Sequence, residues 1–236
     1  MYLPHHFTVT DLAQITAFVD AAQSADLVTF DGTRPVSTLL PVIWDRPEFA
    51  TEAAAGAASA TDTSGGIDPG SYGRLLCHMA IANEQWQTAL PGAQALAIVR
   101  GPQAYISPGW YESKSRHGRV VPTWNYEAVH LTGTIEFRQD TEWLRSFVTR
   151  LTKLHEAERE YPWAVSDAPP EYIDGQLRAI VGVEFTITAI EAKQKLSQNR
   201  SDLDRDGVVA GLRGVPGAGP AAIANAMAAQ LELRQA

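Results

Sequence analysis

The chain has 236 residues, of which 45% are hydrophobic and 19% are charged, a balance typical of a globular protein with one sizeable core. Nineteen basic side chains against 27 acidic ones leave a net charge of -8, which disfavours nucleic-acid binding unless the positive charge is concentrated. The single cysteine, Cys77, excludes an intramolecular disulfide, and no apolar signal core follows Met1, so we expect a cytoplasmic protein. Asn225 and Gln230 interrupt the most apolar late stretch, so we expect no membrane span.

The first part of the chain predicts a helix, a hairpin and an insertion. Thr10 is expected to cap a helix over residues 12–22, whose apolar positions recur at the three-and-four spacing of one buried face. Residues 27–30 and 36–44 flank an Asp-Gly turn and predict a hairpin, because Asp-Gly supplies the positive φ that tight hairpins need. Residues 48–70 are rich in Ala, Ser, Thr and Gly without periodicity, which indicates a flexible surface insertion.

The remainder alternates strands with helices. Residues 180–190 carry five apolar side chains in period two, so this is the clearest strand, expected at the centre of a barrel. The other expected strands are 75–79, 95–99, 103–107 and 128–137, and the expected helices are 83–90, 141–154, 201–212 and 221–233. Six or more strands with peripheral helices predict an α+β fold built on a closed antiparallel barrel. We expect one domain over residues 1–213, with the insertion at 48–70, and a C-terminal linker and helix over 214–236.

Aromatic and cationic side chains are densest between Tyr105 and Tyr126, within one predicted loop region. Planar aromatic rings flanked by cations suit a flat, phosphorylated cofactor, because the rings stack and the cations neutralise phosphate. Alternatively, the aromatic rings cap one end of the barrel and the cations lie in a solvated loop. Composition alone does not separate these two interpretations. The side chains singled out are Trp110, Tyr111, Lys114, Trp124, Asn125 and Tyr126.

Two further groups of polar residues lie near predicted strands. Arg34, Ser37 and Thr38 could offer a guanidinium and hydroxyls to phosphate or ribityl groups, or could belong to an ordinary half-exposed strand. His78 ends a predicted strand and Asn83 begins a predicted helix, where exposed amide groups attract anions. The alternative is that Asn83 only caps its helix, which is the more frequent use of asparagine at that position.

The rest of the sequence gives little support for a metal site or for several common enzyme motifs. His130 lies on a predicted strand and His155 on a predicted helix, and neither has ligand-like neighbours in the sequence, so a metal site is poorly supported. Gly-rich phosphate loops, nucleophile elbows and paired-cysteine motifs do not occur in the sequence. Dinucleotide-binding, P-loop and hydrolase functions are therefore disfavoured.

A set of short motifs runs in order along the chain. They are Met1-Tyr2-Leu3-Pro4, Gly101-Pro102 leading into Tyr105-Ile106-Ser107, Trp110-Tyr111, Val121 to Tyr126, Ala128-Val129-His130, and Lys195 to Arg200. This order of motifs, spanning the chain to Leu212, resembles the PaiB family of FMN-binding proteins, which are usually described as negative transcriptional regulators. The resemblance implies an FMN-binding split barrel similar to pyridoxamine phosphate oxidases. It also implies a homodimer in which two subunits share the flavin sites at their interface.

Together with the chemistry above, the resemblance implies which residues contact FMN. The expected cofactor-binding residues are Arg34, Ser37, Thr38, His78, Asn83, Trp110, Tyr111, Lys114, Trp124, Asn125, Tyr126, Gln198, Asn199 and Arg200. Relatives commonly have Thr-His-Leu-Pro where this chain has Leu39 in second place, and a leucine cannot transfer a proton. Relatives often have an arginine where this chain has Ile81, which removes a cation and predicts weaker flavin affinity. The insertion at 48–70 lengthens the connection between these two motifs and could reshape the mouth of the site.

Three functions follow as hypotheses. The first is a regulator or redox sensor in which FMN is a structural or redox signal; direct DNA binding is doubtful, because the chain is acidic and has no recognisable DNA-reading helix. The second is a flavin-dependent oxidoreductase that acts on a small molecule. The third is a haem-binding protein with His78 or His130 as an axial ligand.

The sequence generates one mutational prediction. Replacing Trp124 and Asn125 with alanine is expected to lower the FMN content without unfolding the chain, because both side chains are predicted to contact the cofactor. The measurement is the flavin absorbance of each purified variant. Aggregation with the cofactor retained would instead assign a structural role to this segment.

Overall fold

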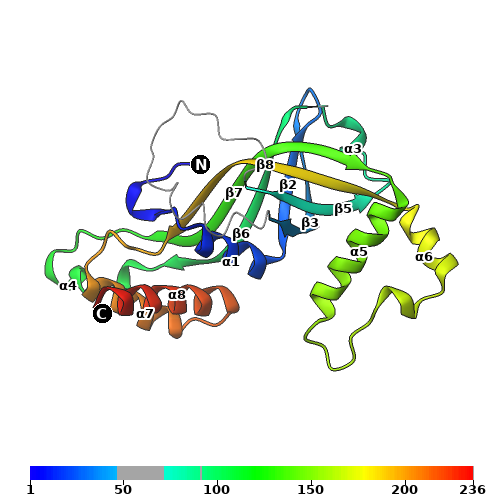
Figure 1. Cartoon of the computed structure of the whole chain (residues 1–236). Coiled ribbons are helices and arrows are strands. Elements are labelled where there is room, and N and C mark those ends of the chain that lie inside the picture. Colours follow the sequence, from blue (N-terminus) through cyan, green and yellow to red (C-terminus); the bar gives the residue numbers. More distant parts are fainter. Residues whose placement is uncertain (47–71, 91, 236) are drawn as a thin grey trace. The chain divides into compact units, whose positions relative to one another are not determined.

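The computed structural model describes residues 1–46, 72–90 and 92–235, so the predicted insertion at 48–70 lies outside the described residues. The strands are β1 Thr8–Val9, β2 Ser24–Phe30, β3 Pro35–Pro41, β4 Ile43–Asp45, β5 Arg74–Ala80, β6 Gln94–Ile106, β7 Thr123–Arg138 and β8 Ile180–Lys195 (Figure 1). The helices are α1 Leu12–Ala22, α3 Gln85–Thr88, α4 Ser113–His117, α5 Thr141–Glu156, α6 Pro170–Leu177, α7 Asp202–Arg213 and α8 Ala218–Gln235. Within the described residues, none of the helices is both long enough and apolar enough to cross a membrane.

The chain is divided into two compact units. Unit 1 comprises Met1–Thr10, Arg100–Val129 and Glu191–Ala236, and unit 2 comprises Asp11–Val99 and His130–Ile190. Strands β6, β7 and β8 each contribute residues to both units. The division expected from the sequence, a domain over 1–213 followed by a linker and helix, stays a prediction.

The sheet of unit 2 curls into a barrel. Its strands pair in the order β3-β2-β6-β7-β8-β5-β4, and the pairs β2–β3, β2–β6, β4–β5 and β5–β8 are antiparallel. The two ends of this order, β3 and β4, are joined through Val42 alone, so they must lie near each other in space. An order whose first and last strands are neighbours along the chain requires a curled sheet. The predicted split barrel with peripheral helices is confirmed.

The core of unit 2 is built from alternate strand residues. On β8, Val181, Val183, Phe185 and Ile187 are each 0% exposed, and this strand lies between β7 and β5, as predicted for a central strand. Burial of a side chain of this size contributes about 1.5–3 kcal/mol. The same alternation buries residues of five more strands: Leu27, Leu40, Leu75, Cys77, Met79, Ala95, Ala97, Val99 and Leu131.

Helix α5 packs on the sheet of unit 2, as predicted. Phe147 and Leu151 of the helix form a buried cluster with Leu76 of β5. The Asp140 carboxylate accepts a hydrogen bond from the Trp143 backbone N–H at 2.7 Å, which caps the first turn. The cap fixes the start of the helix, so that its apolar face meets β5.

Unit 1 has a sheet with helices on one face. Figure 1 shows α7 and α8 side by side, and Val208, Leu212, Ile223 and Met227 of these helices are each at most 1% exposed. They pack in one cluster with the β6 residue Ile106, which is also fully buried. The short strand β1 pairs with β8 in this unit. Helix α8 is therefore part of the core of unit 1.

Several element boundaries differ from the predictions. The cap of α1 is Asp11 rather than Thr10, and its carboxylate accepts from the Ala13 N–H at 2.9 Å. The single strand predicted over 36–44 is divided at Val42, which separates β3 from β4 and whose N–H donates to the Gln23 carbonyl at 3.0 Å. The hairpin itself is confirmed, and Gly32 adopts φ +95° in its turn.

Two predicted interruptions of the sheet do not occur. The strands predicted at 95–99 and 103–107 are one strand, β6, since pairing with β7 overrides the local turn preference of Gly101-Pro102. Strand β7 begins at Thr123, so the Trp124 to Tyr126 motif lies on a strand rather than in a loop. Helix α8 begins at Ala218, three residues before the expected start.

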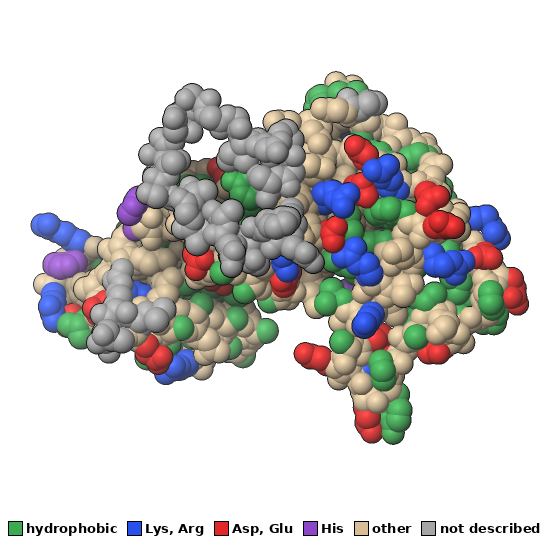
Figure 2. All heavy atoms as spheres, viewed as in Figure 1, with side chains coloured by type: hydrophobic (Ala, Val, Ile, Leu, Met, Phe, Trp, Pro, Cys, Tyr) green, Lys and Arg blue, Asp and Glu red, His purple; other side chains and the backbone are tan. Residues whose placement is uncertain are grey.

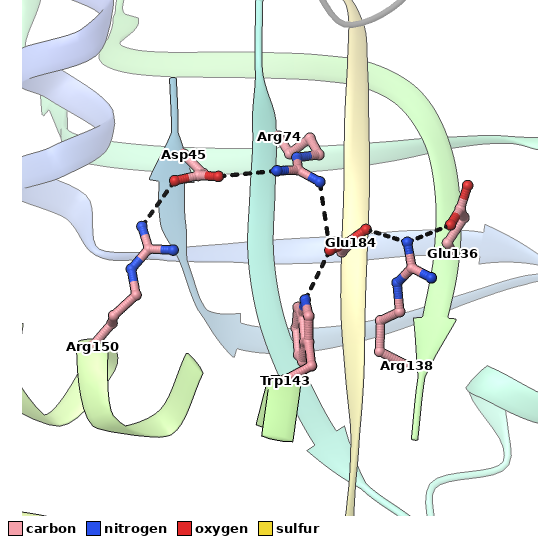
Figure 3. Close-up of polar contacts among 7 residues, drawn as sticks. All are labelled: Asp45, Arg74, Glu136, Arg138, Trp143, Arg150 and Glu184. Carbon is pink, nitrogen blue, oxygen red and sulfur yellow. Dashed lines mark hydrogen bonds and ion pairs between the residues drawn. The ribbon is translucent and has the colours of Figure 1, made fainter. Parts of the chain in front are cut away.

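A buried carboxylate in unit 2 joins three elements (Figure 3). Glu184 of β8 is 7% exposed and accepts hydrogen bonds from Arg138 Nη2 of β7 at 2.7 Å and Trp143 Nε1 of α5 at 2.8 Å. Arg74 of β5 approaches the same carboxylate at 3.5 Å. Burial alone would raise the pKa of Glu184, but the hydrogen bonds and the guanidinium charges outweigh burial and lower it.

The charged network continues from Arg74 across the sheet. Asp45 of β4 pairs with Arg74 at 3.2 Å and with Arg150 of α5 at 2.9 Å. On the visible face of unit 2 in Figure 2, side chains of both signs are interspersed. The network therefore links α5 to four strands, β4, β5, β7 and β8, without forming a patch of one sign.

The Glu184 network predicts acid sensitivity of unit 2. Because the folded pKa of Glu184 is lowered, the stability that this group contributes is present at neutral pH and is lost as pH falls below about 4. Glu184→Gln is expected to lower the free energy of unfolding at pH 7 by about 2 kcal/mol and to flatten its acid dependence. The measurement is urea unfolding between pH 3 and pH 7, values that bracket a glutamate at about pH 4.

Glu136→Gln is the matched control, because Glu136 pairs with the same Arg138 at 2.8 Å but its side chain is 66% exposed. This exposed pair is expected to change the free energy of unfolding by about 0.5 kcal/mol or less. Equal losses in the two variants would contradict the role assigned to Glu184.

Candidate functional site

One face of the unit 1 sheet carries aromatic rings and lysines. Tyr105 of β6 and Trp124 of β7 are 49% and 46% exposed, and their rings meet edge to face at 6.3 Å between centroids. The Lys193 ammonium lies 5.3 Å from the ring centroid of Tyr126 and 5.5 Å from that of Tyr2. We call Tyr2, Tyr105, Trp124, Tyr126, Lys193 and Lys195 the aromatic–lysine face.

Strand alternation places this face opposite the helices. Ile106 and Leu196 pack with α7 and α8, whereas their chain neighbours Tyr105 and Lys195 point the other way. Lys195 Nζ donates to Thr123 Oγ1 at 2.6 Å and to the Trp124 carbonyl at 2.8 Å. Burial lowers the pKa of Lys195, and nearby Lys193 adds to this effect. The positive charge of Lys195 is thus held beside the exposed Trp124 ring.

Asn125 lies on the opposite, helix-covered side of β7. It is 0% exposed, its amide exchanges hydrogen bonds with the Ser197 hydroxyl at 3.1 and 3.2 Å, and its Nδ2 donates to the Met227 sulfur at 3.4 Å. Ser197 adopts φ +62° at the turn after β8, so the Asn125 amide holds a strained turn in place. The structure shows Asn125 in a structural role within the core of unit 1.

Tyr111 and Arg200 lie together at the end of the unit 1 core. The Arg200 guanidinium stacks 4.9 Å from the Tyr111 ring centroid, and Tyr111 is 3% exposed. The phenol oxygen has no partner with hydrogen-bond geometry. Burial raises the pKa of Tyr111, while nearby Arg200 and Ser197 partly oppose that rise. These two predicted residues are therefore brought together, with one polar atom left unsatisfied.

The turn between β8 and α7 is held by local hydrogen bonds. Gln198 Oε1 accepts from the Leu196 N–H at 2.7 Å, and its Nε2 donates to the Gln194 carbonyl at 2.6 Å. Asp204 accepts from both the backbone N–H and the hydroxyl of Ser113 at 2.9 Å. Gln198 therefore uses its amide to stabilise the turn.

Trp110 packs into a groove on α7. A Cβ atom added at Gly211 would lie 2.4 Å from the Trp110 ring, and one added at Gly207 would lie 2.2 Å from the Trp110 carbonyl. Only glycine allows this approach, so Trp110 is partly buried against the helix. Among the other predicted residues, Lys114 on α4 and Asn199 after β8 are exposed.

In unit 2, predicted residues meet around a buried amide that the sequence did not single out. Gln85 is 1% exposed, its side-chain oxygen accepts from Thr38 Oγ1 at 2.5 Å, and its backbone N–H donates to Asn83 Oδ1 at 2.9 Å. Asn83 Nδ2 donates to Thr38 Oγ1 at 3.0 Å. Gln85 Nε2 also donates to the Leu27 carbonyl at 2.9 Å and the Val36 carbonyl at 3.2 Å. Asn83 thus bonds α3 to β3, in addition to its place before the helix.

The outward face of β3 carries the remaining residues of this strand. Ser37 and Leu39 are exposed, with Leu39 at 61%, and they pair across the hairpin with Val28 and Asp26. The Arg34 side chain is 79% exposed and lies 3.5 Å from Asp31. Hydrogen bonds to Thr33 and Arg34 lower the pKa of Asp31 to about 2. Arg34 and Ser37 are accessible to a ligand, whereas the Thr38 hydroxyl is already engaged.

His78 lies against α5 in unit 2. Its ring meets Phe147 edge to face at 5.6 Å, burial lowers its pKa, and its Nδ1 has no hydrogen-bond partner. Cys77, the next residue toward the N-terminus, is buried on the other face of β5, and burial raises the pKa of its thiol to about 12. Within the described residues, no three His, Cys, Asp or Glu side chains are grouped so that they could hold a metal ion.

Some residues were not singled out from the sequence, because their roles depend on strand alternation or on partners far away in the chain. Lys193 and Glu127 are both buried polar residues of unit 1, and burial raises the pKa of Glu127. The residues next to them in their strands alternate in side-chain type, which indicates that the strands have two different faces. Because Trp124 was assigned to a loop, this alternation was not recognised in the sequence. Gln85 has no motif around it that distinguishes it from any other glutamine.

The structure changes the expectation for one of the two alanine substitutions. Asn125→Ala is expected to lower the free energy of unfolding by about 1–3 kcal/mol, because it leaves the Ser197 hydroxyl buried without its amide partner. Trp124→Ala removes a half-exposed ring and is expected to cost less than about 1 kcal/mol while lowering FMN content. The measurements are urea unfolding and bound flavin per chain. A Trp124→Ala protein that keeps its full flavin content would remove Trp124 from the site.

Comparison with known proteins supplies the family. The sequence profile of the family described as "Putative FMN-binding domain" matches residues 1–189. The chain is 29% identical over 209 residues to the protease synthase and sporulation protein PAI 2 of Bacillus subtilis, covering 89% of this chain and 87% of that protein. It is 32% identical over 196 residues to an uncharacterized protein of Aspergillus fumigatus, covering 74% of this chain and 75% of that protein.

Two solved structures are similar at the level of the fold. A FAD and haem binding protein of Mycobacterium smegmatis gives a TM-score of 0.51 at 16% identity, covering 86% of this chain and 80% of that chain. A conserved hypothetical protein of Mycobacterium tuberculosis gives a TM-score of 0.53 at 11% identity, covering 92% and 99%. With the family match spanning residues 1–189 and similarity to the Bacillus subtilis protein over 89% of the chain, the chain belongs to the PaiB family of FMN-binding proteins.

Proposed function

We propose that this chain is an FMN-binding regulator or redox sensor of the PaiB type, and that the aromatic–lysine face of unit 1 contacts the flavin. The observation that carries the proposal is the pair of half-exposed rings, Tyr105 and Trp124, beside the ammonium group of Lys195. Exposed aromatic rings on a sheet are costly unless they serve binding. Family membership supplies the identity of the cofactor.

The residues of this face fit the chemistry of FMN. A flat ring system stacks on Trp124 or Tyr105, and Lys195, the less buried of the two lysines, supplies positive charge to offset an anionic group. The rings are held in position, because Trp124 Nε1 donates to Gln103 Oε1 at 3.0 Å and Lys195 anchors the Trp124 backbone. FMN, when bound, supplies one-electron or two-electron redox chemistry. The protein supplies binding and orientation.

In unit 2, Arg34 and Ser37 are exposed beside β3, and their contact with phosphate or ribityl oxygens stays a prediction from the resemblance. Thr38 and Asn83 act as positioning residues, because their side chains hold β3 through Gln85. Trp110, Gln198 and Asn125 support the folded segments next to the site. A direct contact of FMN with Tyr111, Lys114, Asn199 or Arg200 stays a prediction from the resemblance.

The side chains of Leu39 and His78 favour the sensor function over that of an oxidoreductase. Leu39 is 61% exposed and has no proton to transfer. His78 is packed against Phe147, so its imidazole is directed toward α5. Leu39 cannot act as a general acid or base, which favours a redox signal over rapid turnover of a substrate.

We propose that the functional form is a homodimer with the cofactor at the subunit interface. The outward face of the β2–β3 hairpin supports this proposal, because Phe30 and Leu39 are 42% and 61% exposed on adjacent strands. A second copy would cover these apolar side chains. Direct operator binding is not part of the proposal, since the net charge is -8. A cytoplasmic location stays a prediction from the sequence.

The visible absorption spectrum of the purified protein tests the cofactor. Two flavin bands are expected, together with uptake of added FMN by the stripped protein. A colourless protein that takes up no FMN would contradict the proposal, and a single intense Soret band would support haem.

To separate a sensor from an oxidoreductase, NADH and NADPH consumption is followed in air. Slow reduction without sustained turnover is expected, whereas continuous consumption would favour the enzyme.

A further inference from the structure

A pocket of about 690 Å³ opens in unit 2. Its walls come from the end of β2, helix α3 and the segment after it, the start of β6, and the last part of β7. This volume lies within the range of small-molecule sites, about 300–1,000 Å³. None of the fourteen cofactor-binding residues expected from the sequence lines it.

The walls of the pocket are aromatic and apolar. Trp86 and Phe137 meet edge to face at 6.3 Å between ring centroids, and both line the cavity. Phe30 and Leu90, which also line it, are 42% and 45% exposed. Covering these side chains would gain about 25 cal/mol for each Å² of apolar surface removed from water. The pocket therefore favours a ligand with an apolar, ring-shaped body.

The pocket is held open by hydrogen bonds from its own walls. Trp86 Nε1 donates to the Ile81 carbonyl at 2.8 Å, and the Leu90 N–H donates to the Phe30 carbonyl at 3.3 Å. Gln85, at the start of α3, bonds to the carbonyls of Leu27 and Val36 on the hairpin. A preformed pocket loses little conformational entropy when a ligand binds.

The near absence of charged side chains among the residues that line the pocket indicates which class of ligand it can bind. Among the residues that line the pocket, Glu136 alone has an ionisable side chain, and it pairs with Arg138 at 2.8 Å. The other polar lining groups are uncharged, and they include Gln87, Gln94 and Thr134. An anion would find no positive lining group and would lie near a carboxylate. A neutral molecule with a hydrogen-bonding group fits both the apolar walls and these uncharged side chains.

We propose that this pocket binds a neutral, ring-containing small molecule with at least one hydrogen-bonding group, at a site separate from the flavin. The proposal goes beyond the flavin function and does not depend on it. The ring packs between Trp86, Phe137 and Leu90, and the polar group meets the uncharged side chains.

Isothermal titration of the full, FMN-loaded chain with 2-naphthol tests the pocket, with 2-naphthoate as an anionic probe of the same ring size. One 2-naphthol is expected per chain, with affinity about tenfold higher than for 2-naphthoate. Ala93→Phe fills the pocket from its wall and is expected to weaken 2-naphthol binding about tenfold or more. Ala157→Phe is the matched control, because Ala157 is exposed at the end of α5 and does not line the pocket.

Leu90→Glu is a second variant, in case Ala93→Phe fails to fold, since Leu90 is exposed at the rim and the added charge should repel an apolar ring. The proposal is overturned if the wild-type chain does not bind 2-naphthol, if 2-naphthoate binds equally well, or if the pocket variants bind as tightly as the control. Flavin absorbance recorded on each sample shows independently whether FMN is bound, so failure of the pocket is distinguishable from failure of the flavin proposal.

Discussion

The carboxamide of Gln85 is the interaction on which the ligand-facing parts of unit 2 depend. Its nitrogen bonds to the Leu27 and Val36 carbonyls, and its oxygen accepts from Thr38, so a single side chain links both strands of the hairpin to α3. A fully buried amide with several partners is costly to disturb, because each partner left behind would be buried and unpaired. The orientation of β3 and the walls of the aromatic pocket are therefore determined by the same residue.

In unit 1, a single strand contributes one face to the core and the other face to the proposed ligand site. On β7, Asn125 is buried toward α8 while Trp124 is half exposed on the other face. The helices remove one face of the sheet from water and leave the other available. Core packing thereby fixes the strand, and the strand in turn fixes the spacing of Trp124 and Tyr126, so the stability of the helix-covered side supports the geometry of the open side.

Patterns within the sequence were sufficient for the fold and the family, but not for the details of the site. Period-two alternation identified β8, and an Asp-Gly turn identified the hairpin, because both depend on local chemistry. Trp124 was assigned to a loop, since aromatic density resembles a ligand loop when strand pairing is not visible. Gln85 and Glu184 could not have been found, because the partners of their side chains lie 41 to 110 residues away in the chain. Such contacts exist only once the strands have paired.

The length of β7, Thr123–Arg138, has a consequence for how this family can change over evolutionary time. A strand has a side-chain period of two, so losing or gaining one residue within it reverses every face that follows. One deletion near the middle would turn the fully buried Leu131, which follows it, out of the core. Selection can therefore vary the length of the surface connections freely, whereas the long strands can change only by substitution.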